Sequence, residues 1–173
     1  MESNIEIKAH CHDYEGTEKR IQQMATTFIG EDSQTDTYFT TKRGRFKLRE
    51  SSISGPYLIP YLRPDSNGPK KSLYQKITIT DSDTAKLLFE QLFGIHLVVK
   101  KKRKIYMYQN VRIHLDQVEG LGNFIELEAV LPADDPDEPA QIIKVKYLMQ
   151  QLGIAEQDQI ATSYETMLQI REQ

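Results

Sequence analysis

Most of the chain alternates between polar and apolar residues with a period of two, which is typical of half-buried β-strands. The clearest stretch is Arg45–Arg49, where charged residues flank Phe46 and Leu48. Segments rich in glycine, proline and asparagine separate such stretches and indicate turns. Eight strands are predicted, over Asn4–Ala9, Thr35–Thr41, Arg45–Arg49, Tyr57–Arg63, Leu73–Thr80, Val98–Tyr108, Arg112–Asp116 and Phe124–Glu128.

Four segments instead carry apolar residues at helical spacing, and the first three end at a glycine, a common helix stop. These helices are predicted over Glu15–Ile29, Ser82–Phe93, Pro139–Leu152 and Gln157–Ile170. The acidic, proline-rich stretch 132–139 is interpreted as a connection inside one domain, because few residues follow it. The fold class is therefore α+β, with an antiparallel sheet, open or closed into a barrel, decorated by helices over a single domain of residues 1–173.

The polar positions of five of these strands hold charged residues, which are unusual in strands. Arg112, His114 and Asp116 alternate with apolar residues, and so do Glu126 and Glu128. One interpretation is an open sheet with a wet face, where opposite charges pair across strands for about 0.2–1 kcal/mol each. The other is a barrel with the charges inside, where basic groups hold a polyanion and carboxylates hold a hard cation such as Mg²⁺. The pattern alone leaves both open.

The composition and net charge of the chain limit the classes of partner that we expect it to bind. The chain has 173 residues, a net charge of −3 and one cysteine. A slightly acidic protein has no overall field that attracts nucleic acid or anionic membrane. The chain has no apolar run long enough for a membrane helix and no signal-peptide pattern at its start, so we expect a cytoplasmic protein with no membrane or nucleic-acid partner. A single cysteine forms no internal disulfide.

Three local motifs invite a functional interpretation, and each also has a structural one. The basic run Lys100–Lys104 is split between the two faces of a strand, which argues against nucleic-acid binding. His10-Cys11-His12 invites a metal site, but neighbouring strand residues point to opposite sides, so a structural role is favoured. For His114, a role as ligand-facing acid or base and a structural hydrogen bond both stay open.

These residues resemble those of a known family. Asn4-Ile5-Glu6-Ile7-Lys8 resembles the Glu-x-Glu-x-Lys opening of the CYTH superfamily, named for class IV adenylyl cyclase and thiamine triphosphatase. The pair Ser163-Tyr164 is similar to part of the family's C-terminal helix. Four more stretches resemble the class-IV-cyclase-like branch in family order, namely Gln34–Phe39, Gly44–Arg49, Leu58–Asp65 and Arg112–Glu128.

The resemblance implies a triphosphate tunnel, a closed eight-stranded antiparallel barrel lined with charge. It implies that Mg²⁺ or Mn²⁺ is held by Glu6, Asp116, Glu126 and Glu128. It implies that the polyphosphate is gripped by Lys8, Lys47, Arg49, Arg63, Lys76, Lys101, Arg103 and Arg112. Among these groups Lys8, Arg103 and Asp116 are the candidate catalytic residues. Asn4 departs from the pattern, because it stands where the family has its first glutamate. An amide oxygen can ligate a metal but brings no charge.

Three functions follow from the resemblance. The first is an adenylyl cyclase, in which the ribose 3′-hydroxyl of ATP attacks the α-phosphorus and releases pyrophosphate. The second is a triphosphatase that hydrolyses tripolyphosphate, thiamine triphosphate or a nucleotide. The third is a non-catalytic protein that binds a polyphosphate or diphosphate metabolite. In each case the partner is a small phosphorylated molecule, and the protein is expected to be a monomer or homodimer.

Overall fold

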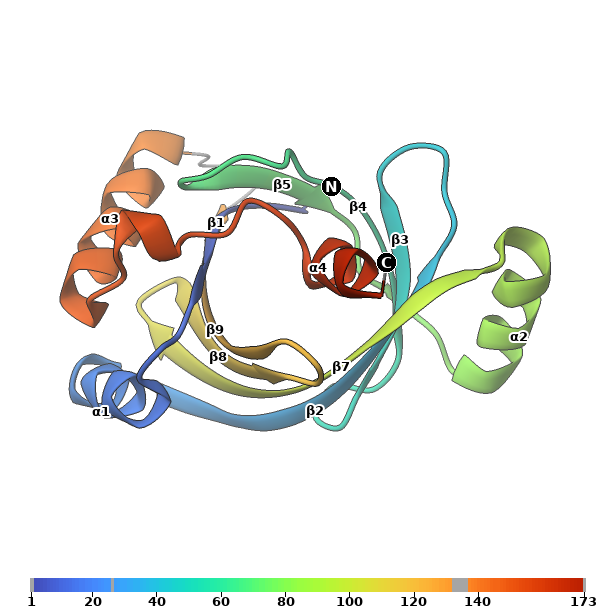
Figure 1. Cartoon of the computed structure of the whole chain (residues 1–173), viewed down its shortest axis with the longest axis horizontal. Coiled ribbons are helices and arrows are strands. Elements are labelled where there is room, and N and C mark those ends of the chain that lie inside the picture. The colour runs from blue at the N-terminus through green and yellow to red at the C-terminus, as the bar shows by residue number, and fades with distance from the viewer. Residues whose placement is uncertain (1, 26, 132–136, 173) are drawn as a thin grey trace.

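The computed structural model describes residues 2–25, 27–131 and 137–172, and its centre is a closed antiparallel barrel (Figure 1). Most of the predicted connection over 132–139 lies outside these described residues. The strands are β1 (Glu2–His10), β2 (Thr27–Phe39), β3 (Arg45–Ser51), β4 (Tyr57–Leu62), β5 (Lys70–Tyr74), β6 (Ile77–Thr78), β7 (Ile95–Tyr108), β8 (Val111–Val118) and β9 (Gly122–Leu131).

Eight of these strands form the ring, in the order β3-β2-β7-β8-β9-β1-β5-β4. Pairing of β3 with β4, through Arg45 opposite Tyr61 to Arg49 opposite Tyr57, closes it. The short strand β6 pairs with β4 beside the ring. The eight-stranded closed barrel expected from the family resemblance is therefore confirmed, and the open-sheet interpretation is wrong.

Many apolar residues of the strands face outward into a core that helices cover. On β8, Ile113 and Leu115 are fully buried in the core that α1 (Tyr14–Met24) and α3 (Glu138–Leu152) complete. The helices contribute residues such as Ile21 and Leu148 to the same core. Because the strand side chains alternate, Arg112, His114 and Asp116 of β8 must then face the barrel interior. The inward charge therefore results from packing helices on the outside.

Two predicted boundaries are wrong because strand pairing prevails over local periodicity. The first helix ends at Met24 rather than Ile29, and Thr27–Ile29 begin β2. There Thr27 lies opposite Met107 of β7, so the pairing with the long strand decides the conformation of this segment. Similarly, the predicted strand Leu73–Thr80 is replaced by β5 and β6, with Gln75 and Lys76 between them.

The predicted C-terminal helix is shorter and is preceded by extended chain. A 3₁₀ turn, η1 (Glu156–Asp158), is followed by a segment that bonds to β1, since the Ile160 backbone N–H donates to the Lys8 carbonyl. Helix α4 (Tyr164–Arg171) then begins after Ser163, which caps it. Figure 1 shows α4 lying across the barrel opening, whereas α2 (Ser82–Phe93) stands to one side of the barrel. Among the described residues, none of the helices has the length and hydrophobicity that a membrane span requires.

Candidate functional site

The barrel encloses a cavity of about 560 Å³, a size typical of small-molecule sites. All eight cations predicted to grip phosphate line it, namely Lys8, Lys47, Arg49, Arg63, Lys76, Lys101, Arg103 and Arg112. Three predicted metal ligands, Glu6, Glu126 and Glu128, line the same cavity. The strand ring therefore brings together residues that are spread over most of the sequence.

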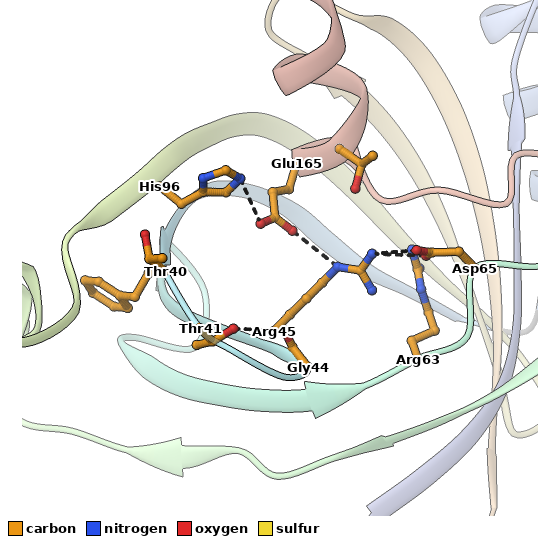
Figure 2. A pocket seen from close by; sticks show the side chains of 10 residues that line it. Thr40, Thr41, Gly44, Arg45, Arg63, Asp65, His96 and Glu165 are labelled. Atoms are coloured by element: carbon orange, nitrogen blue, oxygen red, sulfur yellow. Dashed lines mark hydrogen bonds and ion pairs between the residues drawn. The ribbon is translucent and has the colours of Figure 1, made fainter.

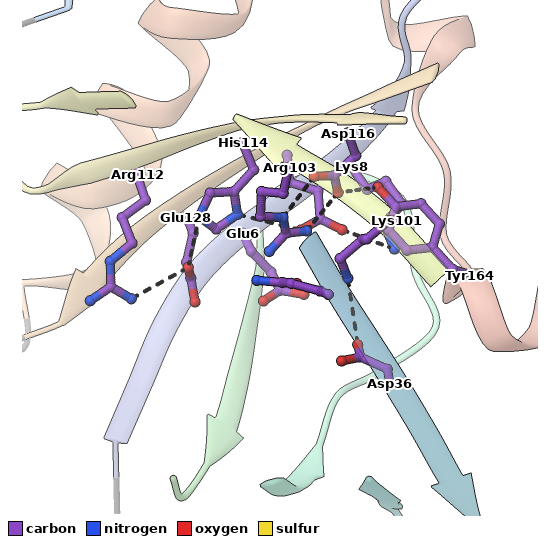
Figure 3. A network of polar contacts seen from close by, with 12 residues as sticks. Glu6, Lys8, Asp36, Lys101, Arg103, Arg112, His114, Asp116, Glu128 and Tyr164 are labelled. Carbon is purple, nitrogen blue, oxygen red and sulfur yellow. Dashed lines mark hydrogen bonds and ion pairs between the residues drawn. The ribbon is translucent and has the colours of Figure 1, made fainter. Parts of the chain in front are cut away.

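Asp116 differs from the other predicted metal ligands, because it lies in the wall with no exposed surface. Arg103 donates to both of its oxygens at 2.7 and 2.6 Å, and the Tyr164 hydroxyl donates to it at 2.8 Å (Figure 3). Arg103 also donates to Glu126 at 2.7 Å. Asp116 thus holds a cavity cation in place and is itself fully occupied.

The glutamates of the cavity each lie beside a cation. Glu126 Oε1 is 3.2 Å from Lys8 Nζ, and Glu6 Oε1 is 2.9 Å from Arg63 Nη1. Glu128 Oε2 is 3.6 Å from Arg112 Nη1. These glutamates project from neighbouring strands, because Glu6 of β1 lies directly opposite Glu128 of β9.

Charge pairing keeps Glu126 and Arg103 ionised. Burial alone would raise the pKa of Glu126, but Arg103 and Lys8 outweigh burial and hold that pKa well below its usual value. Burial would likewise lower the pKa of Arg103, but Asp116 and Glu126 raise it. His114 faces the cavity, and burial followed by the nearby Arg103 lowers its pKa. The imidazole is therefore neutral at pH 7 and able to donate or accept one proton.

A second cluster gathers three cavity cations around Asp36 of β2, which is 1% exposed. Lys47 Nζ donates to Asp36 at 2.7 Å, and Arg49 donates through two nitrogens at 2.7 Å each. Lys101 Nζ lies 3.5 Å away. Burial lowers the pKa of Lys101 to about 8 although Asp36 opposes the shift. Sequence reasoning did not single out Asp36, although it lies on the same strand face as Gln34 and Tyr38.

Tyr164 is a second group whose role the sequence did not reveal. It is the first residue of α4 and is buried against the cavity. The Lys8 ammonium lies 3.6 Å from the centre of its ring, a cation–π contact. Since the hydroxyl also donates to Asp116, Tyr164 joins the C-terminal helix to two of the predicted catalytic residues.

A smaller hollow of about 410 Å³ lies beside α4, at the mouth of the barrel where β7 begins (Figure 2). Arg45 crosses it, with Nη2 3.0 Å from Asp65 and Nε 3.2 Å from Glu165 of α4. His96 Nε2 lies 3.5 Å from Glu165. Arg63 lines both this hollow and the main cavity, so the two are neighbours.

The donors in the cavity suit a hard divalent cation. Glu6, Glu126 and Glu128 offer only carboxylate oxygens, the ligand type that Mg²⁺ and Mn²⁺ take. In the described ranges, no three His, Cys, Asp or Glu side chains already converge as a metal cage. This arrangement matches a cation bound by one or two carboxylates together with substrate phosphates.

Known proteins resemble this chain over nearly its whole length. The CYTH domain family model matches residues 2–164. A candidate adenylate cyclase of Methanocaldococcus jannaschii is 26% identical over 92% of this chain and 95% of its own length. The adenylate cyclase CyaB of Aeromonas hydrophila is 25% identical over 94% of this chain and 87% of its own length. The solved structure of the PH1012 protein of Pyrococcus horikoshii is 27% identical, covers 96% of this chain and 98% of its own, and has a TM-score of 0.78. The protein therefore belongs to the CYTH domain family.

Proposed function

We propose that this protein is a metal-dependent adenylyl cyclase that converts ATP into cyclic AMP and pyrophosphate. The observation that carries the proposal is the gathering of eight cations and three glutamates around one enclosed cavity. Cations in that number match a triphosphate, whose charge must be neutralised along its length. Relatives named as adenylate cyclases over nearly the whole chain support the same chemistry.

The cavity lining supplies positioning and electrostatic stabilisation. Arg103 and Lys8 would bind phosphate oxygens and stabilise the charge that moves onto the leaving pyrophosphate. Asp116 acts as a positioning residue, because its oxygens are taken by Arg103 and Tyr164. His114, neutral and inside the cavity, is a candidate acceptor for the proton of the ribose 3′-hydroxyl.

Glu6, Glu126 and Glu128 would hold Mg²⁺ or Mn²⁺. The bound cation would neutralise phosphate charge and lower the pKa of the attacking hydroxyl. Each of these glutamates now pairs with a cation of the cavity. Phosphate oxygens of the substrate would compete for the same guanidinium and ammonium groups, and this would release carboxylate oxygens to bind the metal.

An organic triphosphate suits the lining better than an inorganic one. Toward the mouth where β7 ends, the cavity is lined by apolar and aromatic side chains, namely Ile29, Ile53, Tyr57, Ile105 and Met107. Inorganic tripolyphosphate has no group for such a surface. A nucleoside does, because a base buries a flat apolar face.

A triphosphatase is the second candidate function. The hollow beside α4 shares Arg63 with the main cavity and lies at the barrel mouth. A triphosphate whose terminal phosphorus reaches Arg63 would meet solvent there, and water could attack that phosphorus. The lining is the same for both reactions, and they differ in which phosphorus lies in line with which nucleophile.

Phosphorus-31 NMR of ATP with purified protein, in Mg²⁺ and again in Mn²⁺, distinguishes the candidates. Cyclic AMP with pyrophosphate is the expected product pair. ADP with phosphate would replace the cyclase by the triphosphatase. Unchanged ATP that nevertheless binds would leave the non-catalytic binding function. An Arg103→Lys variant is the matched control, because it keeps the charge but loses the two-nitrogen contact with Asp116 and should slow either reaction at least tenfold.

A further inference from the structure

Six buried polar atoms of cavity-lining residues lack hydrogen-bond partners in the described structure. Two of them, Asn4 Oδ1 and Ser72 Oγ, belong to residues that lie side by side. The two residues are 1% and 3% exposed and line the cavity. Asn4 of β1 lies directly opposite Ser72 of β5, so their side chains are neighbours on the same face. Burying a polar group without a partner is costly, and a pair of such groups therefore indicates a ligand.

The orientation of Asn4 follows from its other contact. Its Nδ2 donates to Glu128. Because an ionised carboxylate only accepts hydrogen bonds, the amide must turn its nitrogen to Glu128 and leave Oδ1 free to accept. Ser72 Oγ can donate or accept. Together they offer one acceptor and one hydroxyl, which suits a hydroxyl or amino group.

The location of the pair identifies which part of a substrate it would meet. The start of β1 and the end of β5 pair with each other, and the chain of strand registers places them at the same mouth as the end of β7. In the ring β5 lies four strands from β7, on the opposite side. The polar pair thus faces the apolar wall that contains Ile105 and Met107.

We propose that Asn4 and Ser72 form a hydrogen-bonding subsite for the nucleoside part of a triphosphate ester, and that this subsite selects nucleotides over inorganic tripolyphosphate. The inference rests on the proposed function for the position of the phosphates. It gives Asn4 a role of its own, because the amide binds substrate at the position where the family pattern has a glutamate. The group recognised is a ribose hydroxyl or an amino group of the base.

The test is a Ser72→Ala variant, since Ser72 Oγ makes no hydrogen bond in the described structure. Ligand binding is measured by calorimetry in EDTA, where metal-dependent turnover is absent. We expect affinity for ATP to fall about threefold to tenfold, the loss of one hydrogen bond, with affinity for tripolyphosphate unchanged. The melting temperature of the ligand-free protein should stay the same or rise. Lys47→Met is the matched control and should lower the affinity for ATP and for tripolyphosphate by the same factor.

Analogues identify the recognised group. The loss of affinity caused by Ser72→Ala is measured with 2′-deoxy-ATP, 3′-deoxy-ATP and inosine triphosphate, which lack the 2′-hydroxyl, the 3′-hydroxyl and the base amino group. This loss should disappear with the analogue that lacks the group bound by Ser72. The proposal is overturned if Ser72→Ala lowers the affinity for ATP and tripolyphosphate equally, or does not lower the affinity for ATP at all. It is also overturned if the variant lowers the melting temperature of the ligand-free protein, or if the loss of affinity persists with all three analogues. A serine acting through a metal would show no effect in EDTA, which also overturns it. A selective loss in a protein that makes no cyclic AMP would instead reject the proposed reaction and keep the subsite.

Discussion

Replacing Asp36 with asparagine tests whether the cavity cations depend on an internal anion. The carboxylate accepts from Lys47 and Arg49 and lies 3.5 Å from Lys101. An amide keeps the shape but removes the negative charge that Lys47, Arg49 and Lys101 share. Removing one partner of a buried ion pair costs about 3–5 kcal/mol. For a domain of this size, about 3 kcal/mol corresponds to a fall in melting temperature of roughly 6–12 °C.

Asp32→Asn is the matched control, because Asp32 is also buried on β2 but its partners are neutral. It accepts from Gln34, Ser51 and Ser52 rather than from cations. Its loss leaves no unpaired charge, so we expect a smaller cost of about 1–2 kcal/mol.

The assay is thermal unfolding with and without tripolyphosphate in EDTA. A ligand at about 100 times its dissociation constant stabilises a protein by about 2.7 kcal/mol. In Asp36→Asn the phosphate takes the place of the lost carboxylate, so its melting temperature should rise more than that of the wild type. In Asp32→Asn the rise should equal the wild-type one. The reasoning is refuted if the ligand raises the melting temperatures of all three proteins equally, or if Asp36→Asn is no less stable than Asp32→Asn.

The pH dependence of the Asp36→Asn deficit follows from the pKa of Asp36. Burial would raise this pKa, but Arg49, Lys101 and Lys47 hold it well below the usual value. A lowered carboxyl pKa contributes stability that is complete above the unfolded pKa, about 3.9, and is lost as the pH falls toward the folded value. The part of the difference that comes from this carboxyl should therefore be complete above about pH 5 and shrink near and below pH 4.

Three further predictions concern single groups. Glu128→Gln should lower turnover at least tenfold and raise the Mg²⁺ concentration needed for half-maximal rate, and an unchanged metal titration would contradict its role. The pKa of Lys101 is about 8, so tripolyphosphate affinity should fall above pH 8, whereas Lys101→Arg should flatten this profile in calorimetric titrations. Asp116→Asn should lower kcat at least tenfold by freeing Arg103, and Tyr164→Phe should lower it less, because it keeps the Arg103 contact. Equal effects of the two would contradict the positioning role.

Local sequence determined the parts of this protein that depend on neighbouring residues. The alternation within Arg45–Arg49 and Arg112–Asp116 predicted both strands and the common face of their charges. Helix α2 was predicted with its observed bounds, Ser82–Phe93, because its apolar spacing and its stop at Gly94 are local signals. The family resemblance implied the eight cations that line the cavity, although Lys76, Lys101 and Arg103 lie outside the stretches that carry the resemblance.

Boundaries failed where distant strands compete with local preference. The segment Thr27–Ile29 continues the apolar spacing of α1 but pairs with the end of β7, almost 80 residues along the chain. Hydrogen bonds of a sheet are satisfied by another strand, so periodicity within one segment carries no information about them.

Only the tertiary structure decided the partners of the buried charges. Ring closure between β3 and β4 turned a sheet with one charged face into an enclosed cavity. The register of β7 on β8 placed Arg103 opposite Asp116, and the position of α4 added Tyr164 to the same carboxylate, 48 residues away. The register of β2 on β3 and β7 likewise brought Asp36 to three cations. A sequence specifies which side of a strand is charged, but which charges meet depends on register and closure, and these are set by packing over the whole barrel.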